Sequence, residues 1–210
     1  MDARRTLIVS ICLVFLCPPT AHPQHTSPRH LLICFGDSIT AGYGLRSDQA
    51  YPSALQHDLN KLGYHYTVVN QGTSGATTKD AVADLRSIIN QHPDIVIVEF
   101  GGNDGLRGLP LTQTRANLDS ILAGLSAAHI KVLLAGITLP PNYGPGYIRQ
   151  FDALFPELAR KHHAAIVPMI YKDLVHVPAT IQSDGIHPTA KGSEIIAHTM
   201  LPALKPLLRN

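Results

Sequence analysis

A short segment near the start of the chain, Gly36-Asp37-Ser38, places a hydroxyl where a nucleophile could act. It directly follows the apolar run 31–35. A serine at a tight turn from strand into helix has its hydroxyl held out at the sheet edge, and the free amides at the helix start can donate to an anion. The same tripeptide also makes an ordinary turn and helix cap. Ser38 is therefore a candidate nucleophile that needs partners from elsewhere in the chain.

A candidate base lies near the C-terminus, in Asp184-Gly185-Ile186-His187. An imidazole needs an acceptor that fixes its tautomer and stabilises its protonated form, and a carboxylate three residues earlier on a turn can fold back to supply it. A surface turn with a cap would also explain this pattern. Asp184 and His187 are therefore a candidate orienting group and general base.

Two glycine-containing loops could supply hydrogen-bond donors. The loop 70–78 is built of small residues, so its backbone can approach a ligand closely. In Gly101-Gly102-Asn103-Asp104-Gly105, Asn103 offers an amide that can donate to a developing oxyanion without adding a charge. Ordinary loop chemistry, with glycine at positive φ and asparagine in an Asx-turn, accounts for both loops equally well.

The elements that must position these residues are predicted from hydropathy. Five short apolar runs favour buried strands, at 31–35, 66–69, 94–100, 131–137 and 165–169. Apolar stripes at helical spacing lie between them: Tyr51, Leu55, Leu59 and Leu62; Val82, Leu85 and Ile88 or Ile89; and Leu118, Ile121, Leu122 and Leu125. Two further helices are expected at 150–163 and 189–201, and Pro202 and Pro206 should kink or end the last one near Leu201.

Alternation of strands and helices predicts an α/β fold, a three-layer α/β/α sandwich around a five-stranded parallel sheet. In such sheets the ligand crevice lies beyond the carboxyl ends of the strands. Three of the candidate segments directly follow predicted strands, and the fourth precedes the last helix. The segments 105–112 and 138–148 should wall the crevice as mobile apolar loops, and Tyr51 and Tyr147 are expected to pack rather than to contact substrate.

The first thirty residues have the pattern of a targeting segment. A basic start with Arg4 and Arg5 precedes an apolar run at 6–17, which is shorter than the roughly 20 residues that span a bilayer. We expect a signal peptide over residues 1–21, cut after Ala21 or elsewhere in 18–28, and a periplasmic or secreted product without a stable membrane anchor. Leu16 argues against lipidation of Cys17. An uncleaved amphiphilic tail is the alternative.

Composition limits the remaining possibilities. In 210 residues, 45% are hydrophobic and 15% charged, with a mean hydropathy of +0.07, which argues against a disordered, collagen-like or coiled-coil chain. The net charge of +2 gives no electrostatic reason for a nucleic-acid partner. Of three cysteines only Cys34 lies outside the presequence, so we expect no internal disulfide and a buried, unreactive thiol. A single domain over 31–207, acting as a monomer, is expected.

Together, the four segments resemble the SGNH hydrolases, also called the GDSL family. The resemblance consists of Gly-Asp-Ser after the first strand, Gly after the second, Gly-x-Asn-Asp after the third and Asp-x-x-His near the end, in this order. It covers 31–207 and implies a flavodoxin-like fold. The segments 41–45, 101–108 and 140–144 resemble the secreted thioesterase I, arylesterase and lysophospholipase L1 branch.

The resemblance implies a role for each site residue. Ser38 would be the nucleophile, His187 the general base and then acid, and Asp184 the group that orients His187. The oxyanion donors would be the backbone N–H groups of Ser38 and Gly75 and the side-chain amide of Asn103.

Gly72 is a rival to Gly75. The family pattern Ser-Gly-x-Thr-Thr falls on 74–78 and favours Gly75, although Ala76 stands where this branch usually has Asp.

The chemistry implied is acyl transfer to water through an acyl-enzyme, on aryl esters, acyl thioesters or lysophospholipids. No metal or organic cofactor is expected, and the partner is a small-molecule ester or thioester. Two alternatives are an acetyl esterase acting on acetylated carbohydrate and a non-catalytic flavodoxin-like binding module. Six scattered histidines are expected to be solvated rather than to bind metal: His57, His65, His129, His162, His163 and His198.

Overall fold

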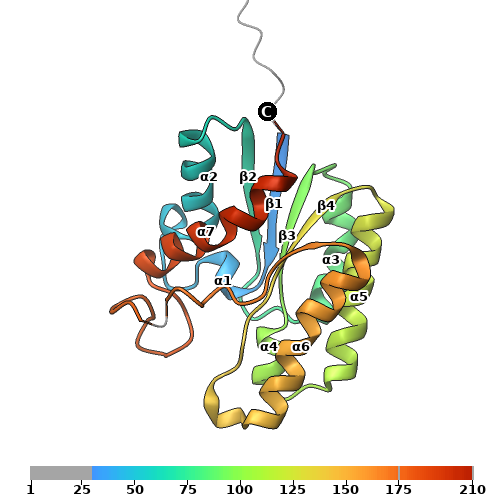
Figure 1. Cartoon of the computed structure of the whole chain (residues 1–210), viewed down its shortest axis with the longest axis vertical. Helices are drawn as coiled ribbons and strands as arrows, with labels where there is room; N and C mark the ends of the chain where they lie inside the picture. The colour runs from blue at the N-terminus through green and yellow to red at the C-terminus, as the bar shows by residue number, and fades with distance from the viewer. Residues whose placement is uncertain (1–29, 175, 210) are drawn as a thin grey trace, which may run out of the picture.

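The computed structural model describes residues 30–174 and 176–209, and the expected signal peptide at 1–21 lies outside them. Five parallel strands form one sheet in the order β2-β1-β3-β4-β5 (Figure 1). The strands are β1 His30–Gly36, β2 Tyr66–Gly72, β3 Ile95–Glu99, β4 Lys131–Ala135 and β5 Ala165–Val167. This order is the flavodoxin-like one, so the predicted fold class is confirmed.

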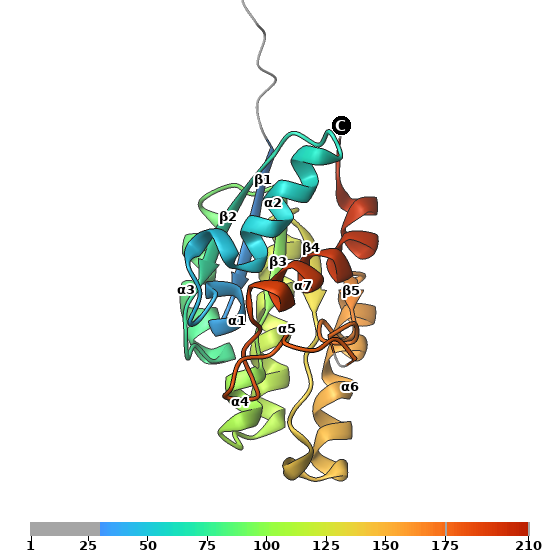
Figure 2. The same cartoon turned by 90° about the vertical axis from the view of Figure 1, so that its left-hand side faces the viewer.

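Helices cover both faces of the sheet (Figures 1 and 2). On one face, α2 (Tyr51–Lys61) packs against α7 (Ala190–Leu204), beside the single turn α1 (Ser38–Ala41). On the other face lie α3 (Thr78–Ile89), α5 (Leu111–Ala127) and α6 (Pro145–His162). The short helix α4 (Gly102–Leu106) follows β3, and 3₁₀ turns occupy Ser47–Gln49, Pro141–Tyr143 and Lys205–Leu207.

The core lies along the three central strands. The side chains of Leu32, Ile97 and Leu133, one from each, are fully buried. Burial on both faces explains why these strands appear in the sequence as unbroken apolar runs. Cys34 belongs to this core, where burial raises the pKa of its thiol to about 12, so it is a packed apolar group as expected.

The side-chain amide of Gln56, on α2, covers part of the edge strand β2. Its Nε2 donates to the carbonyl of Tyr66 at 3.0 Å, and its Oε1 accepts from the N–H of Val68 at 2.7 Å. Two backbone groups that would otherwise face solvent at the sheet edge are thereby satisfied.

Several sequence expectations need correction. Helix α7 does not end near Leu201 but continues through Pro202 to Leu204, because Met200 and Leu204 are fully buried and their packing outweighs the missing N–H. Segments 105–112 and 138–148 are partly helical rather than loops, since α4 and α5 reach into the first and α6 starts at Pro145 in the second. A proline at this first helical position has its φ set for the helix.

Two residues assigned to apolar stripes are exposed. Leu62 follows the last turn of α2 and is 47% exposed, and Val82 on α3 is 38% exposed. Helix α3 instead turns Ala81 and Ile88 inward. Among the described residues, no helix has both the length and the apolar character needed to cross a bilayer.

The buried face of α3 can be checked with two substitutions on the same helix. Ile88→Ala should lower the free energy of unfolding by about 2 to 5 kcal/mol, because it leaves a cavity in the core. Val82→Ala should change it by less than about 1 kcal/mol, since the side chain is exposed and alanine is the better helix former. Urea denaturation measures both, and equal losses would contradict the assignment.

Candidate active site

A hydroxyl, an imidazole and a carboxylate meet at the carboxyl end of β1. Ser38 is the first residue of α1, and its Oγ lies 2.9 Å from His187 Nε2. The Nδ1 atom of the same ring lies 2.7 Å from Asp184 Oδ2. The structure thus brings together the three residues that the sequence singled out for nucleophilic chemistry.

The turn that carries Asp184 fixes its carboxylate. Oδ1 accepts from the backbone N–H groups of Ile186 at 2.9 Å and His187 at 3.0 Å. Partial burial acts to raise the pKa of Asp184, but hydrogen bonds from the His187 ring and these amides outweigh it and lower the pKa to about 2. Asp184 is therefore ionised at neutral pH and accepts the Nδ1 proton, which leaves Nε2 to accept from Ser38.

Three side chains that the sequence did not single out for the site hold the His187 turn in place. Gln182 donates through Nε2 to the carbonyl of Tyr43 at 2.8 Å, and its backbone N–H donates to the carbonyl of His187 at 2.8 Å. The Tyr171 hydroxyl donates to the carbonyl of Ile186 at 2.9 Å. The Tyr43 ring lies over the imidazole, with centroids 4.6 Å apart. No local motif predicts the two contacts of Tyr43, because they join segments far apart in the chain.

Two backbone N–H groups, in the segments that follow β1 and β2, are available as donors. Among the described residues, the N–H groups of Ser38 and Gly75 have no hydrogen-bond acceptor. Gly75 has φ +82°, a left-handed conformation suited to glycine, and Arg107 donates to its carbonyl at 2.8 Å. The rival Gly72 is already engaged, since its N–H donates to Asn70 Oδ1 at 2.9 Å.

The side-chain amide of Asn103 lies between two acceptors. Its Nδ2 donates to the carbonyl of Ala76 at 3.0 Å and to Asp37 Oδ2 at 3.2 Å. A primary amide carries two N–H donors, so both are engaged. An oxyanion at this position would have to share one of them with its present acceptor.

Two buried carboxyl groups lie beneath the site. Asp37 caps α1 and is 1% exposed, and Glu99, at the end of β3, is fully buried. Burial is the largest influence on both: it raises the pKa of Asp37 to about 6 and, with the charge of Asp37, raises the pKa of Glu99 well above its usual range. Sequence reasoning did not single out Glu99. The signal that could have done so is that Glu99 is the only acidic residue in the otherwise apolar run 95–100.

Large apolar side chains are exposed in segments that follow β1 and β3. Tyr43 is 54% and Leu109 37% exposed, which is unusual for large apolar residues in this molecule. The hydroxyl of Tyr143 donates to the carbonyl of Leu106 at 2.7 Å, and that of Tyr147 to the carbonyl of Leu109 at 3.4 Å. These contacts join the 3₁₀ turn Pro141–Tyr143 and the start of α6 to the end of α4 and the segment after it. Tyr51 is fully buried, which confirms its expected packing role.

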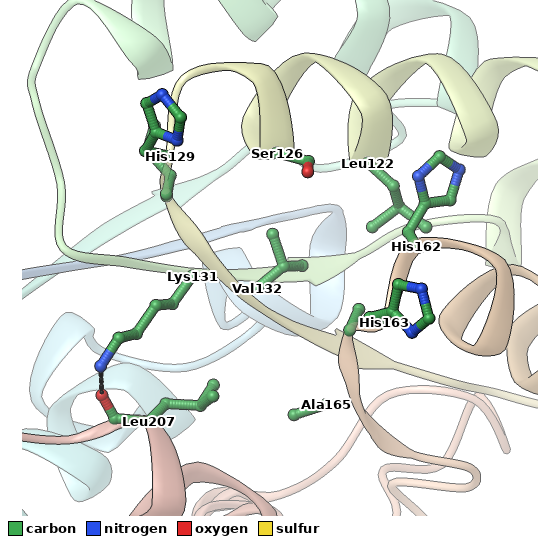
Figure 3. Close-up of a pocket in the computed structure, with 11 residues that line it drawn as sticks. Leu122, Ser126, His129, Lys131, Val132, His162, His163, Ala165 and Leu207 are labelled. Carbon is green, nitrogen blue, oxygen red and sulfur yellow. Dashed lines mark hydrogen bonds between the residues drawn. The ribbon is translucent and has the colours of Figure 1, made fainter.

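A pocket of about 260 Å³ lies at the opposite end of the sheet, beside the start of β4 and β5 (Figure 3). Lys131 Nζ, in its wall, donates to the carbonyl of Leu207 at 2.6 Å, and the His129 ring lies apart from those of His162 and His163. His162 is half-buried and paired with Asp119 at 2.6 Å, so the expectation that it is solvated is wrong. Within 30–174 and 176–209, no group of three or more His, Cys, Asp or Glu could hold a metal ion.

Known proteins share both the sequence and the fold. A model of the GDSL-like lipase/acylhydrolase family matches residues 34–195. The chain is 38% identical over 205 residues to esterase TesA of Pseudomonas aeruginosa, across 97% of this chain and 100% of the relative. It is also 38% identical to the thioesterase 1/protease 1/lysophospholipase L1 of Escherichia coli K12, over 85% of each chain.

Solved structures give the same result. A crystal structure of TesA matches 85% of this chain and 100% of its own with a TM-score of 0.82 and 40% identity. Sequence motifs, strand order and relatives therefore agree, and the chain belongs to the GDSL-like lipase/acylhydrolase family, the SGNH hydrolases, and is an ester-bond hydrolase.

Proposed function

We propose that Ser38 attacks the carbonyl carbon of an ester or thioester while His187 Nε2 takes its proton. His187 then protonates the leaving group, an acyl-enzyme forms on Ser38, and water activated by the same ring releases the acid. Asp184 orients the ring and stabilises its protonated form. The observation that carries this proposal is the position of one imidazole between Ser38 Oγ at 2.9 Å and Asp184 Oδ2 at 2.7 Å.

The oxyanion formed in each step would be held by the backbone N–H groups of Ser38 and Gly75 and by the amide of Asn103. Support comes from the two N–H groups that have no acceptor among the described residues. Such donors typically contribute about 3 to 4 kcal/mol each to transition-state stabilisation, because they act where charge develops. No step in this scheme needs a metal or an organic cofactor.

The substrate would be a small ester or thioester with an apolar acyl or aryl group. Support comes from the exposed ring of Tyr43, which lies over the imidazole of His187, and from the exposed side chain of Leu109 in the segment after α4. The name of the E. coli relative, thioesterase and lysophospholipase, supports acyl thioesters and lysophospholipids as members of it. The enzyme would act as a monomer, with no nucleic-acid partner.

Replacing the nucleophile should abolish turnover. Ser38→Ala removes the attacking oxygen and should lower kcat on a p-nitrophenyl ester by roughly 10³-fold or more, and it should also prevent labelling by a fluorophosphonate. Ser120→Ala is the matched control, because this exposed serine on α5 only donates to the carbonyl of Ala116. Wild-type turnover in Ser38→Ala would end the proposal.

The apolar surface can be tested with esters of increasing chain length. Leu109→Ser should raise KM for long-chain p-nitrophenyl esters several-fold, since each buried methylene contributes about 0.8 kcal/mol, and should leave acetyl ester hydrolysis nearly unchanged. Leu62→Ser, at another exposed leucine, is the control. A wild-type preference for acetyl over longer esters would instead favour the acetyl esterase alternative.

We also infer that the chain is exported by its presequence into the periplasm or the medium. When the full chain is expressed in a bacterial host, the mature protein should be found outside the cytoplasm with a new N-terminus in 18–28. N-terminal sequencing of the fractionated protein measures this. Intact Met1 on the mature enzyme would show that the segment is an uncleaved tail.

A further inference from the structure

Asp37 and Glu99 form a carboxyl pair at the adjacent ends of β1 and β3. Both side chains are almost completely buried, and the charge of Asp37 is close enough to Glu99 to raise the pKa of that carboxyl group. Glu99 Oε2 accepts from Thr40 Oγ1 at 2.8 Å and from the backbone N–H of Asp37 at 3.3 Å. The pair lies directly beneath the turn that presents Ser38.

The surroundings of the pair favour one negative charge rather than two. The titratable groups that face it are His187, Tyr51 and Tyr171, and no lysine or arginine among the described residues bonds either carboxyl group. Two carboxylates in contact in a buried site repel each other, so one retains a proton. Glu99 is the more deeply buried of the two and has the more strongly raised pKa.

A buried oxygen atom of Glu99 without a hydrogen-bond partner supports the view that Glu99 keeps its proton. Glu99 Oε1 is buried and has no hydrogen-bond partner when both acids are taken as ionised. As an O–H group it becomes a donor, and the acceptor that we assign to it is the carboxylate of Asp37, whose backbone N–H already bonds the other oxygen of Glu99. A proton shared by the two carboxyl groups would give Glu99 Oε1 a hydrogen-bond partner. It would also remove the repulsion between two negative charges.

Asp37 connects the pair to the reacting groups. Its Oδ1 accepts from the N–H of Ile39 at 3.0 Å, which fixes the turn that carries Ser38. Its Oδ2 accepts from Asn103 Nδ2 at 3.2 Å, which fixes the amide proposed to face the oxyanion. A Cβ added at Gly102 would lie 3.3 Å from Asp37 Oδ2, so the carboxylate has little room to rotate.

We propose that Glu99 is a positioning residue that stays protonated and donates its proton to the Asp37 carboxylate, which in turn holds the Ser38 turn and the Asn103 amide in register for the oxyanion. The inference rests on the proposed function, because it assigns Asn103 and Ser38 to the oxyanion site. Neither Glu99 nor Asp37 touches substrate.

Kinetics of three variants test the role. Glu99→Gln keeps the size of the side chain, can accept from Thr40 and can donate to Asp37, so its kcat should stay within about threefold of wild type. Glu99→Met fills the same space without a donor, and Asp37→Asn removes the charge; each should lower kcat about 10- to 100-fold with little change in KM, as expected for a lost transition-state interaction. Asp152→Asn, a carboxyl bonded only to Thr138 Oγ1, should behave as wild type.

The pH dependence of stability tests the proton itself. A carboxyl group with a higher pKa in the folded than in the unfolded state binds more protons when folded, so stability falls as pH rises from the unfolded pKa, about 4.3, towards the folded one. Over this window the unfolding constant of wild type should rise relative to that of Glu99→Gln, by up to about tenfold per pH unit. Urea denaturation at several pH values measures the ratio.

The outcomes separate this inference from the proposed function. Wild-type turnover by Ser38→Ala would contradict the proposed function, whatever the activity of the Glu99 variants. If Ser38→Ala is inactive but a folded Glu99→Met retains wild-type kcat, or the two stability curves run parallel with pH, the positioning role is wrong. If Glu99→Met does not fold, the kcat of Asp37→Asn and the stability curves of wild type and Glu99→Gln decide the question.

Discussion

The contact between His187 and Ser38 is the interaction on which the site depends, and it joins residues 149 positions apart in the chain. It can form because β1 is an inner strand of the sheet, between β2 and β3, and ends at the same edge that the segment before α7 crosses. Long-range closure of this kind is costly in chain entropy, and burial of the central strands on both faces offsets it. The chemistry is therefore a consequence of the packing of β1, β3 and β4.

Close packing against α1 at this edge leaves no room for side chains at two glycines. A Cβ added at Gly36 would lie 2.0 Å from Thr40 Oγ1, and one at Gly72 would lie 2.1 Å from the backbone nitrogen of Ala41. The ends of β1 and β2 thus pack directly on the turn that carries Ser38. Glycine at these positions gives Ser38 a rigid support on two sides.

Sequence predicted the strands and the sheet well, because strand cores are continuous apolar runs. It also singled out Ser38, Asp184 and His187, which the structure brings together, because their motifs are local. It placed Val82 on the wrong face because helical period alone leaves the edge of an apolar stripe undefined. It ended α7 too early because the packing of Leu204 is a tertiary effect. Glu99 escaped notice because the partners that make an acid tolerable in a core come from other strands and turns.

The amide of Gln56 on the edge strand β2 has a consequence for assembly. Strand addition requires a row of unpaired peptide groups, and here the carbonyl of Tyr66 and the N–H of Val68 are already taken by a side chain of the same molecule. A neighbouring polypeptide could not extend the sheet at these positions without displacing it. Gln56 thereby protects this part of the edge strand against edge-to-edge pairing.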